Sequence, residues 1–160
     1  MGSVFRLARS RHAQARDDIL SGEAARRHGG RWNFKRVPMI YTSATLALAV
    51  LEVLVQSEDL PRDYVMIELH LPDSLPSEVL ATEDLPVDWK AYPAPNSTQR
   101  IGSAWIRTSR SAALWVPSAL VPSERNCLLN PGHPELVRVT ATVSPFDFDP
   151  RLRPKKRARS

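Results

Sequence analysis

The most apolar stretch of the chain runs from residue 44 to residue 55, where only Thr45 and Glu52 are polar. This pattern predicts a helix that is apolar on every side, and such a helix is normally buried on every side. A carboxylate inside a packed interior needs a partner, because burying an unpaired charge costs many kcal/mol. We therefore predict that Glu52 is paired there, with Arg31 of the GGRWN segment as its partner. The alternative is that the helix reaches the surface at Glu52.

The remaining pattern predicts several short strands and two further helices. Runs of apolar and β-branched residues predict strands at residues 4–7, 37–42, 64–71, 114–116, 127–129 and 137–143. Helices are predicted around residues 13–20 and from residue 96 or 97 to residue 108. Residues 21–30 and the proline-rich residues 72–95 are predicted to be irregular. Pro38 favours an edge or strand-start position, and Thr42 or Ser43 is the predicted cap of the apolar helix.

The order of these elements indicates the fold class. Strands occur near both ends of the chain with helices between them, and no regular strand–helix–strand rhythm or internal repeat is present. A length of 160 residues suits one domain with its own core. We therefore predict a single α+β domain with a mainly antiparallel sheet, spanning residues 1–152.

The charge balance does not indicate a nucleic-acid-binding protein. The chain has 22 Lys and Arg against 17 Asp and Glu, but six of the basic residues lie in the last ten positions. The rest of the chain has 16 basic and 17 acidic residues, so the positive charge belongs to the end of the chain. We expect residues 153–160 to form a basic, solvated and disordered tail, and we expect no direct specific binding of nucleic acid.

Two further features bear on the cellular setting. No apolar run reaches the length that spans a bilayer, and the first residues lack a secretory signal, so we expect no contact with a membrane. The single cysteine, Cys127, excludes an internal disulfide and suits a reducing compartment. These features predict a cytoplasmic location.

The sequence lacks the motifs of several common chemistries. The four histidines show no metal-ligand spacing, so we expect no metal site. No P-loop, dinucleotide-binding glycine motif or nucleophile elbow occurs. The remaining polar candidates are Arg31, Tyr41, Glu52, Ser118 and Asn126. Guanidinium binds phosphate, an aromatic ring stacks on a base, and a carboxylate stabilises an oxocarbenium-like transition state, so this set suits an anionic ligand with a ribose.

Several segments of the chain together resemble the RES domain family. They are GGRWN with the following P-x-I-Y-T-S run and helix, then IGSAWIRT, LWVPSALVPSERNCLLNPGHP and PFDFDPRL, in the family's order. The family is named for Arg, Glu and Ser positions, which correspond here to Arg31, Glu52 and Ser118. The resemblance covers residues 4–152 and implies a fold like that of diphtheria-toxin-type ADP-ribosyltransferases.

The resemblance also implies a bacterial type II toxin that consumes NAD and pairs with an Xre-like helix-turn-helix antitoxin. By position, Arg31 would bind the dinucleotide, Tyr41 would stack near the nicotinamide, and Glu52 would act at the glycosidic bond. Ser118 and Asn126 would line the same pocket. The chain departs from the family at Lys35-Arg36, where a glycine is expected.

Three functional alternatives stay open at this point. The protein could cleave the nicotinamide–ribose bond of NAD with water or phosphate as acceptor, or transfer ADP-ribose to a protein side chain. It could also be a non-catalytic module that binds a partner. The sequence leaves a homodimer as a further option.

Overall fold

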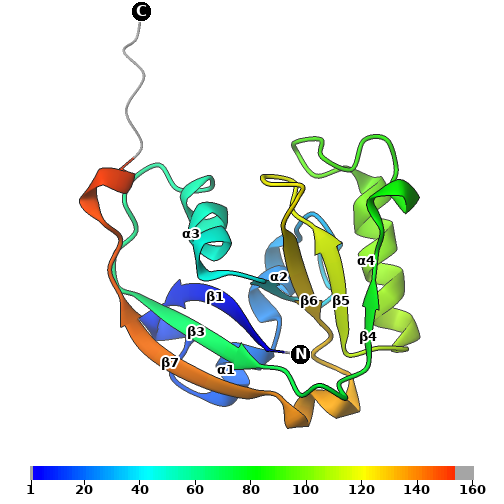
Figure 1. Cartoon of the computed structure of the whole chain (residues 1–160), viewed down its shortest axis with the longest axis horizontal. Helices are drawn as coiled ribbons and strands as arrows, with labels where there is room; N and C mark the ends of the chain where they lie inside the picture. Colours follow the sequence, from blue (N-terminus) through cyan, green and yellow to red (C-terminus); the bar gives the residue numbers. More distant parts are fainter. Residues whose placement is uncertain (1, 154–160) are drawn as a thin grey trace, which may run out of the picture.

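The computed structural model describes residues 2–153 and forms one seven-stranded sheet with four α-helices around it (Figure 1). The strands are β1 (Ser3–Arg9), β2 (Ile40–Ser43), β3 (Tyr64–His70), β4 (Ser77–Val79), β5 (Ala113–Pro117), β6 (Arg125–Leu129) and β7 (Thr140–Phe146). The α-helices are α1 (Arg16–Leu20), α2 (Glu23–His28), α3 (Leu46–Leu54) and α4 (Asn96–Thr108). Short 3-10 turns lie at Ser10–His12, Thr82–Asp84, Pro134–Arg138 and Pro150–Leu152. The expected tail beyond residue 153 lies outside the described residues.

The strand order is β4-β5-β6-β2-β1-β3-β7. Every neighbouring pair is antiparallel except β4 and β5, which are parallel. The predicted α+β class with a mainly antiparallel sheet is therefore confirmed. β1 pairs with its two neighbours over very different lengths. It pairs with β3 from Ser3 to Arg9, whereas its pairing with β2 consists of Phe5 opposite Ser43. The site described below lies beside this junction.

The two faces of β5 and β6 contribute to two different cores. Side chains alternate along a strand, so Leu114, Val116 and Leu128 pack with Trp105 of α4. Their neighbours along the strands face the other core, which includes residues of β1, α1 and β3. That core is formed by Val4, Ala8, Ile19, Ile67, Leu69, Ala113, Cys127 and Leu129, among others. This alternation decides which residues of these strands can reach the site.

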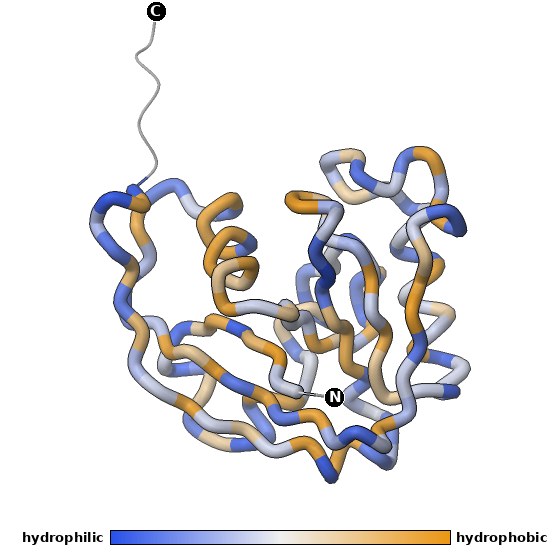
Figure 2. Tube along the Cα trace, viewed as in Figure 1, coloured by the Kyte–Doolittle hydropathy of each residue, from blue (hydrophilic) through white to orange (hydrophobic). Residues whose placement is uncertain are grey.

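The apolar helix α3 is half exposed, so the prediction of a helix buried on every side was wrong. Leu48 and Ala49 are buried against the sheet, whereas Leu51 is 46% and Val55 is 61% exposed. Figure 2 shows α3 as a largely hydrophobic helix on one side of β1 and β3. Thr45, rather than Thr42 or Ser43, caps it, since its Oγ1 accepts a hydrogen bond from the backbone N–H of Leu48.

Other sequence-based boundaries were partly wrong. The segment 21–30 contains α2, and the irregular segment 72–95 contains β4. β2 is a central strand, and Pro38 lies just before it, which agrees with the strand-start alternative and not with an edge. The last strand begins at Thr140 because residues 134–138 form a 3-10 turn. No helix among residues 2–153 is long and apolar enough to cross a membrane.

Candidate active site

Glu52 lies at the centre of the candidate site, on the helix that follows β2. Its Oε1 accepts a hydrogen bond from Asn126 Nδ2 at 2.9 Å and another from Ser118 Oγ at 3.3 Å. The side chain is half-buried and lines a cavity. Within residues 2–153, no hydrogen bond reaches the second carboxylate oxygen, Oε2. The carboxylate is therefore held through one oxygen while the other is available to a ligand.

The pairing of β2 with β6 explains how Asn126 reaches Glu52. Ser43 lies opposite Asn126, and Tyr41 lies opposite Leu128. Because side chains alternate, Tyr41, Ser43 and Asn126 share one face of the sheet. Ser43 Oγ donates to Asn126 Oδ1 at 2.9 Å, which leaves the amide N–H groups directed at Glu52. The amide orientation is thus fixed from both sides.

Ser118 is fully buried at the end of β5. Its Oγ accepts hydrogen bonds from the backbone N–H groups of Leu120 and Val121, at 3.1 and 3.2 Å. The single hydroxyl proton is then left to donate to Glu52. Ser118 therefore holds the β5–β6 turn and Glu52 together, but it is not among the residues that line the cavity.

Arg31 does not pair with Glu52, so the predicted ion pair was wrong. Its Nη1 donates to the backbone carbonyls of Trp89 at 2.9 Å and Ala91 at 2.8 Å. These contacts tie the GGRWN segment to the loop that precedes α4. The partners of Glu52 come instead from β6 and the end of β5, more than 60 residues away in sequence. Sequence proximity suggested the wrong partner, because the sheet brings more distant residues closer.

Tyr41 is held at both hydrogen-bonding positions of its hydroxyl group. The hydroxyl accepts from the Trp32 N–H at 3.0 Å and donates to Asn33 Oδ1 at 2.6 Å. Burial raises the pKa of Tyr41 well above its ordinary value, and the contacts with Trp32, Asn33 and the nearby charge of Arg31 oppose this effect only in part. Tyr41 therefore stays protonated and presents its ring to the cavity.

Two residues that the sequence analysis did not select fix this loop. The buried Asn33 donates from Nδ2 to the carbonyls of Ala25 and Val37, at 2.8 and 2.9 Å. Gly102 of α4 lies against the backbone of Trp32: a Cβ at this position would be 1.8 Å from the Trp32 carbonyl oxygen. The GGRWN and IGSAW segments were both noticed in the sequence, but nothing in the sequence showed that they touch.

The departure from the family pattern beside this loop has a clear backbone consequence. Arg36 has φ of 77°, in the left-handed region that favours glycine. Its N–H donates to the Arg26 carbonyl oxygen at 2.7 Å, which ties the loop to α2. Arg36 therefore holds a backbone conformation that glycine would adopt without strain.

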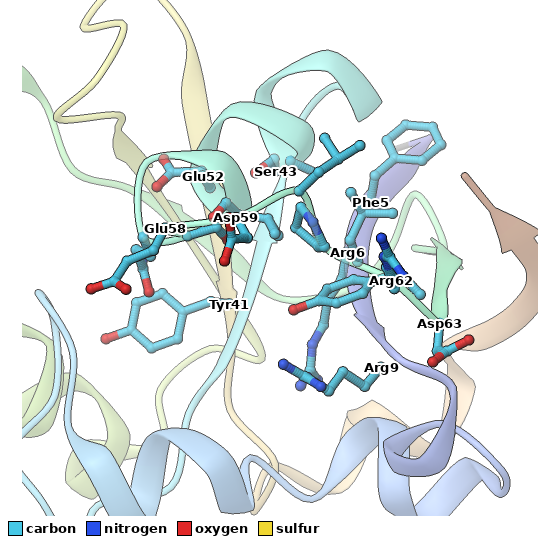
Figure 3. A pocket seen from close by; sticks show the side chains of 18 of the residues that line it. Phe5, Arg6, Arg9, Tyr41, Ser43, Glu52, Glu58, Asp59, Arg62 and Asp63 are labelled. Atoms are coloured by element: carbon cyan, nitrogen blue, oxygen red, sulfur yellow. Dashed lines mark hydrogen bonds between the residues drawn. The ribbon is translucent and has the colours of Figure 1, made fainter. Parts of the chain in front are cut away.

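The cavity beside Glu52 has a volume of about 1130 Å³. Figure 3 shows Glu52, Glu58 and Tyr41 on one side of it, and Arg6, Arg9 and Arg62 toward the other. Arg6 and Arg9 come from β1, and Arg62 and Arg153 come from the segments before β3 and after the last 3-10 turn. None of these four arginines was selected from the sequence, because isolated arginines in different elements give no local signal.

Arg6 is the most desolvated of the cavity arginines. Burial lowers the pKa of Arg6 from its ordinary value, and its Nη1 donates to the Ile19 carbonyl oxygen at 3.0 Å. A guanidinium in such surroundings has further N–H groups to offer to an anion. The cavity thus places a carboxylate at one side and a partly desolvated cation at the other.

Other chemistries find less support in the described residues. Burial raises the pKa of Cys127 to about 12, so the thiol is not an activated nucleophile. Residues 2–153 contain no cluster of three or more His, Cys, Asp or Glu side chains that could hold a metal ion.

Comparison with known proteins identifies the family of this chain. The model of the RES domain matches residues 3–151. A protein named Prs ADP-ribosylating toxin, from Sphingobium sp. (strain YBL2), is 39% identical over 155 residues, which cover 94% of this chain and 96% of that protein. A protein named Toxin Res, from Yersinia enterocolitica, is 39% identical over 137 residues, which cover 83% and 90%.

A solved structure supports the fold. It is the crystal structure of the M. tuberculosis MbcT-MbcA toxin-antitoxin complex, with a TM-score of 0.72, 20% identity and coverage of 94% of this chain and 86% of that chain. At this identity the likeness concerns the fold alone. The family match and the two relatives extend over nearly all of the chain, and they show that this protein belongs to the RES domain family of toxins.

Proposed function

We propose that this toxin consumes NAD by cleaving the bond between nicotinamide and ribose, with water or phosphate as acceptor. The observation that carries the proposal is the Glu52 carboxylate, which is fixed by Ser118 and Asn126 at one side of a cavity with arginines at the other. The cavity volume of about 1130 Å³ exceeds that of most small-ligand sites, as a dinucleotide requires. The printed name of the Sphingobium relative, an ADP-ribosylating toxin, points to the same bond, because ADP-ribose comes from NAD.

In the reaction that we propose, the glycosidic C–N bond breaks and its electron pair moves to the pyridinium nitrogen, which releases neutral nicotinamide. The ribose carbon gains positive charge in the transition state, and Glu52 stabilises that charge through its free oxygen. The oxygen of the acceptor then forms the new bond to the ribose carbon, and the proton of the acceptor passes to the solvent. The amide of Asn126 and the hydroxyl of Ser118 keep the carboxylate in place throughout.

Three further residues are assigned to binding. The ring of Tyr41, whose hydroxyl is fully engaged, stacks near the nicotinamide. Arg6 binds the pyrophosphate, since it is a desolvated guanidinium on the cavity wall. Arg31 acts as a positioning residue, because its Nη1 holds the loop at Trp89 and Ala91.

Transfer of ADP-ribose to a protein is the second candidate, and the name of the Sphingobium relative favours it. Both reactions use the same carboxylate and differ only in the acceptor. Incubation with NAD labelled in the adenine ring, with and without phosphate and with a bacterial lysate, separates them by the products. Free ADP-ribose or its 1-phosphate supports the first reaction, and labelled protein supports the second. Unchanged NAD in every arm would leave the non-catalytic, partner-binding alternative.

We further propose that an Xre-like antitoxin silences the toxin by occupying this cavity. The solved relative is a toxin-antitoxin complex, and an acidic side chain or a terminal carboxylate would satisfy the cavity arginines as a pyrophosphate does. The antitoxin and NAD then compete, and each weakens the binding of the other by the same factor. Titrating antitoxin into the Glu52→Gln protein with a non-hydrolysable NAD analogue tests this. Unchanged affinity at saturating analogue would contradict it.

A further inference from the structure

An aromatic cluster borders the cavity at the start of β3, on the far side from Glu52. Tyr64 lines the cavity and is half-buried. Its ring meets that of Phe148 edge to face, with centroids 5.5 Å apart, and Phe148 meets Phe146 in the same way at 4.9 Å. Phe148 is only 6% exposed, so the Tyr64 ring is held against a packed support. A ring fixed in this way loses little freedom when a ligand stacks on it.

Arg9 lies directly opposite Tyr64 in the pairing of β1 with β3. Directly opposite residues point to the same face of an antiparallel pair. The Arg9 guanidinium carbon is 6.0 Å from the centre of the Tyr64 ring, and Arg9 also lines the cavity. The Ser10 N–H donates to the Asp63 carbonyl oxygen at 2.8 Å, which continues the strand pairing beyond these two residues. The backbone therefore fixes the relative position of the ring and the cation.

The separation of Arg9 from the Tyr64 ring is larger than direct stacking requires. Atoms in contact lie roughly 3.5 Å apart, so a flat base held between two planar groups needs them about 7 Å apart. Among residues 2–153, Arg9 forms no ion pair with a carboxylate, and its side chain is exposed. A small movement of this exposed side chain would admit a planar ring between the guanidinium and Tyr64.

We propose that Arg9 and Tyr64 form a clamp for the adenine base of NAD. This inference rests on the proposed function and adds the orientation of the substrate to it. With the nicotinamide ribose at Glu52 and the pyrophosphate at Arg6, the adenine extends to the start of β3. Both clamp members offer a flat face to a purine, and aromatic and guanidinium groups bind bases by stacking. The clamp gives a role to the part of the cavity that Arg9 and Tyr64 line.

Turnover of two substrates tests the clamp. Nicotinamide mononucleotide carries the scissile bond but lacks the adenine. Tyr64→Leu keeps apolar bulk against Phe148 and removes the aromatic plane, so we expect its KM for NAD to rise about 10-fold, in the range that loss of one stacked base gives. Its KM for nicotinamide mononucleotide should stay that of the wild type. Tyr64→Phe, which retains the ring, should resemble the wild type with both substrates.

Tyr92→Leu is the matched control, because Tyr92 is 90% exposed and does not line the cavity. It should leave both KM values unchanged. An equal rise in KM for both substrates in Tyr64→Leu would overturn the clamp, and so would an unchanged KM for NAD. If Tyr64→Leu does not fold, as judged by its thermal melt, Arg9→Ala replaces it, with the same comparison and the same criteria.

Binding measurements separate failure of the clamp from failure of the proposed function. The Glu52→Gln protein is titrated calorimetrically with NAD and with nicotinamide mononucleotide, with and without Tyr64→Leu. If the clamp binds the adenine, Tyr64→Leu should raise the Kd for NAD about 10-fold and leave the Kd for nicotinamide mononucleotide unchanged. If the wild type releases no nicotinamide from NAD, the proposed function fails while this titration still judges the clamp. Equal binding of NAD with and without Tyr64→Leu would overturn it.

Discussion

The surroundings of Glu52 and of Arg31 differ in how each charge is held. Glu52 is fixed by two side chains from distant strands and keeps one carboxylate oxygen open to the cavity. Arg31 is fixed to two backbone carbonyls of a loop and is not among the residues that line the cavity. The sequence suggested that these two residues form one pair. The structure instead separates a carboxylate with one oxygen open to the cavity from a guanidinium that is engaged with the loop before α4.

The sharpest test of this comparison is Glu52→Gln. The amide oxygen can still accept from Asn126 and Ser118, so the protein should fold, but the negative charge is lost. We expect NAD turnover to fall about 100-fold or more, since one such electrostatic group typically contributes around 3 kcal/mol. Nicotinamide release measures the turnover, and thermal unfolding checks the fold. Turnover like that of the wild type would contradict the role of Glu52.

Tyr41→Phe tests, through the stability of the protein, how the loop that carries Arg31 is held. It removes the acceptor of the Trp32 N–H and the donor to Asn33 while keeping the ring. Leaving such buried groups unsatisfied costs about 2 kcal/mol, which urea unfolding at neutral pH should show. The substituted ring at position 41 offers no hydroxyl, and loss of stability without loss of nicotinamide stacking is the expected signature. A variant as stable as the wild type would mean that the loop is held by other contacts.

The same variant should also change the pH dependence of stability. The pKa of Tyr41 is raised in the folded protein, so the folded state keeps the proton where the unfolded chain loses it. Stability from this group is therefore complete below about pH 10 and is lost as the pH rises from there toward the folded-state pKa. Tyr41→Phe should lack this part of the alkaline loss. If the free energies of unfolding of the two proteins changed by the same amount from pH 8 to 11, this contribution of Tyr41 would be contradicted.

Asn126→Ala tests whether the orientation of Glu52 matters apart from its charge. The variant removes the 2.9 Å hydrogen bond to Oε1 and leaves Ser118 as the remaining partner. We expect kcat to fall about 10-fold with a smaller change in KM, because a misplaced carboxylate still attracts the ligand. Asn126→Asp should be slower still, since a second carboxylate would repel Glu52. Activity of Asn126→Asp above that of Asn126→Ala would contradict this account.

Arg31→Ala distinguishes a positioning residue from one that binds phosphate directly. If Arg31 holds the loop at Trp89 and Ala91, the variant should lose about 1 kcal/mol of stability and show a higher KM. If Arg31 binds the dinucleotide, KM should rise with no change in unfolding. Arg27→Ala is a suitable control, because Arg27 is exposed and, within the described part of the chain, pairs with Glu23 of α2 alone. Thermal melts and NAD kinetics on both variants decide between these outcomes.

The smallest expected effect is that of Arg36→Gly. Glycine adopts the left-handed φ of 77° without strain, so we expect the variant to be more stable by up to about 1 kcal/mol. NAD turnover should not change, because Arg36 does not line the cavity. A loss of stability on urea unfolding would show that the arginine side chain contributes more than the backbone strain costs.

The sequence predicted much of the fold because the main strands and α4 have strong local patterns. The alternation in β3 and the paired Ile101 and Trp105 in α4 are visible without any tertiary information. The short α2 has no such pattern, and the glycines that flank it, Gly22 and Gly29, suggested a loop. Half of α3 is exposed although its residues other than Glu52 are apolar, because the helix packs on the sheet through one side, at Leu48 and Ala49. Local composition does not report which side of a helix the sheet leaves uncovered.

The site residues also divide into those that have a signal in the sequence and those that have none. Glu52, Tyr41, Ser118 and Asn126 were candidates from their chemistry and again through the family resemblance, and the structure brings Glu52, Ser118 and Asn126 into contact. The partners of each charge depend on strand register, which the sequence does not specify, so the Arg31–Glu52 pair was a wrong prediction. Arg6 and Arg9 were missed because each is a single basic residue in an ordinary strand. Their relevance appears only once β1 is seen to border the cavity.

The contact of Gly102 with the backbone of Trp32 has a consequence for protein engineering. Any side chain at position 102 would meet the Trp32 carbonyl oxygen, so the GGRWN segment and the facing turn of α4 fit each other as one unit. A chimera that imports this loop from a relative must import the matching part of α4 as well. Exchanging either segment alone would shift Asn33, which belongs to the loop, together with Tyr41, whose hydroxyl is hydrogen-bonded to Trp32 and Asn33. Modules for grafting in this chain are therefore defined by contacts across the fold, and a continuous stretch of sequence is the wrong unit to exchange.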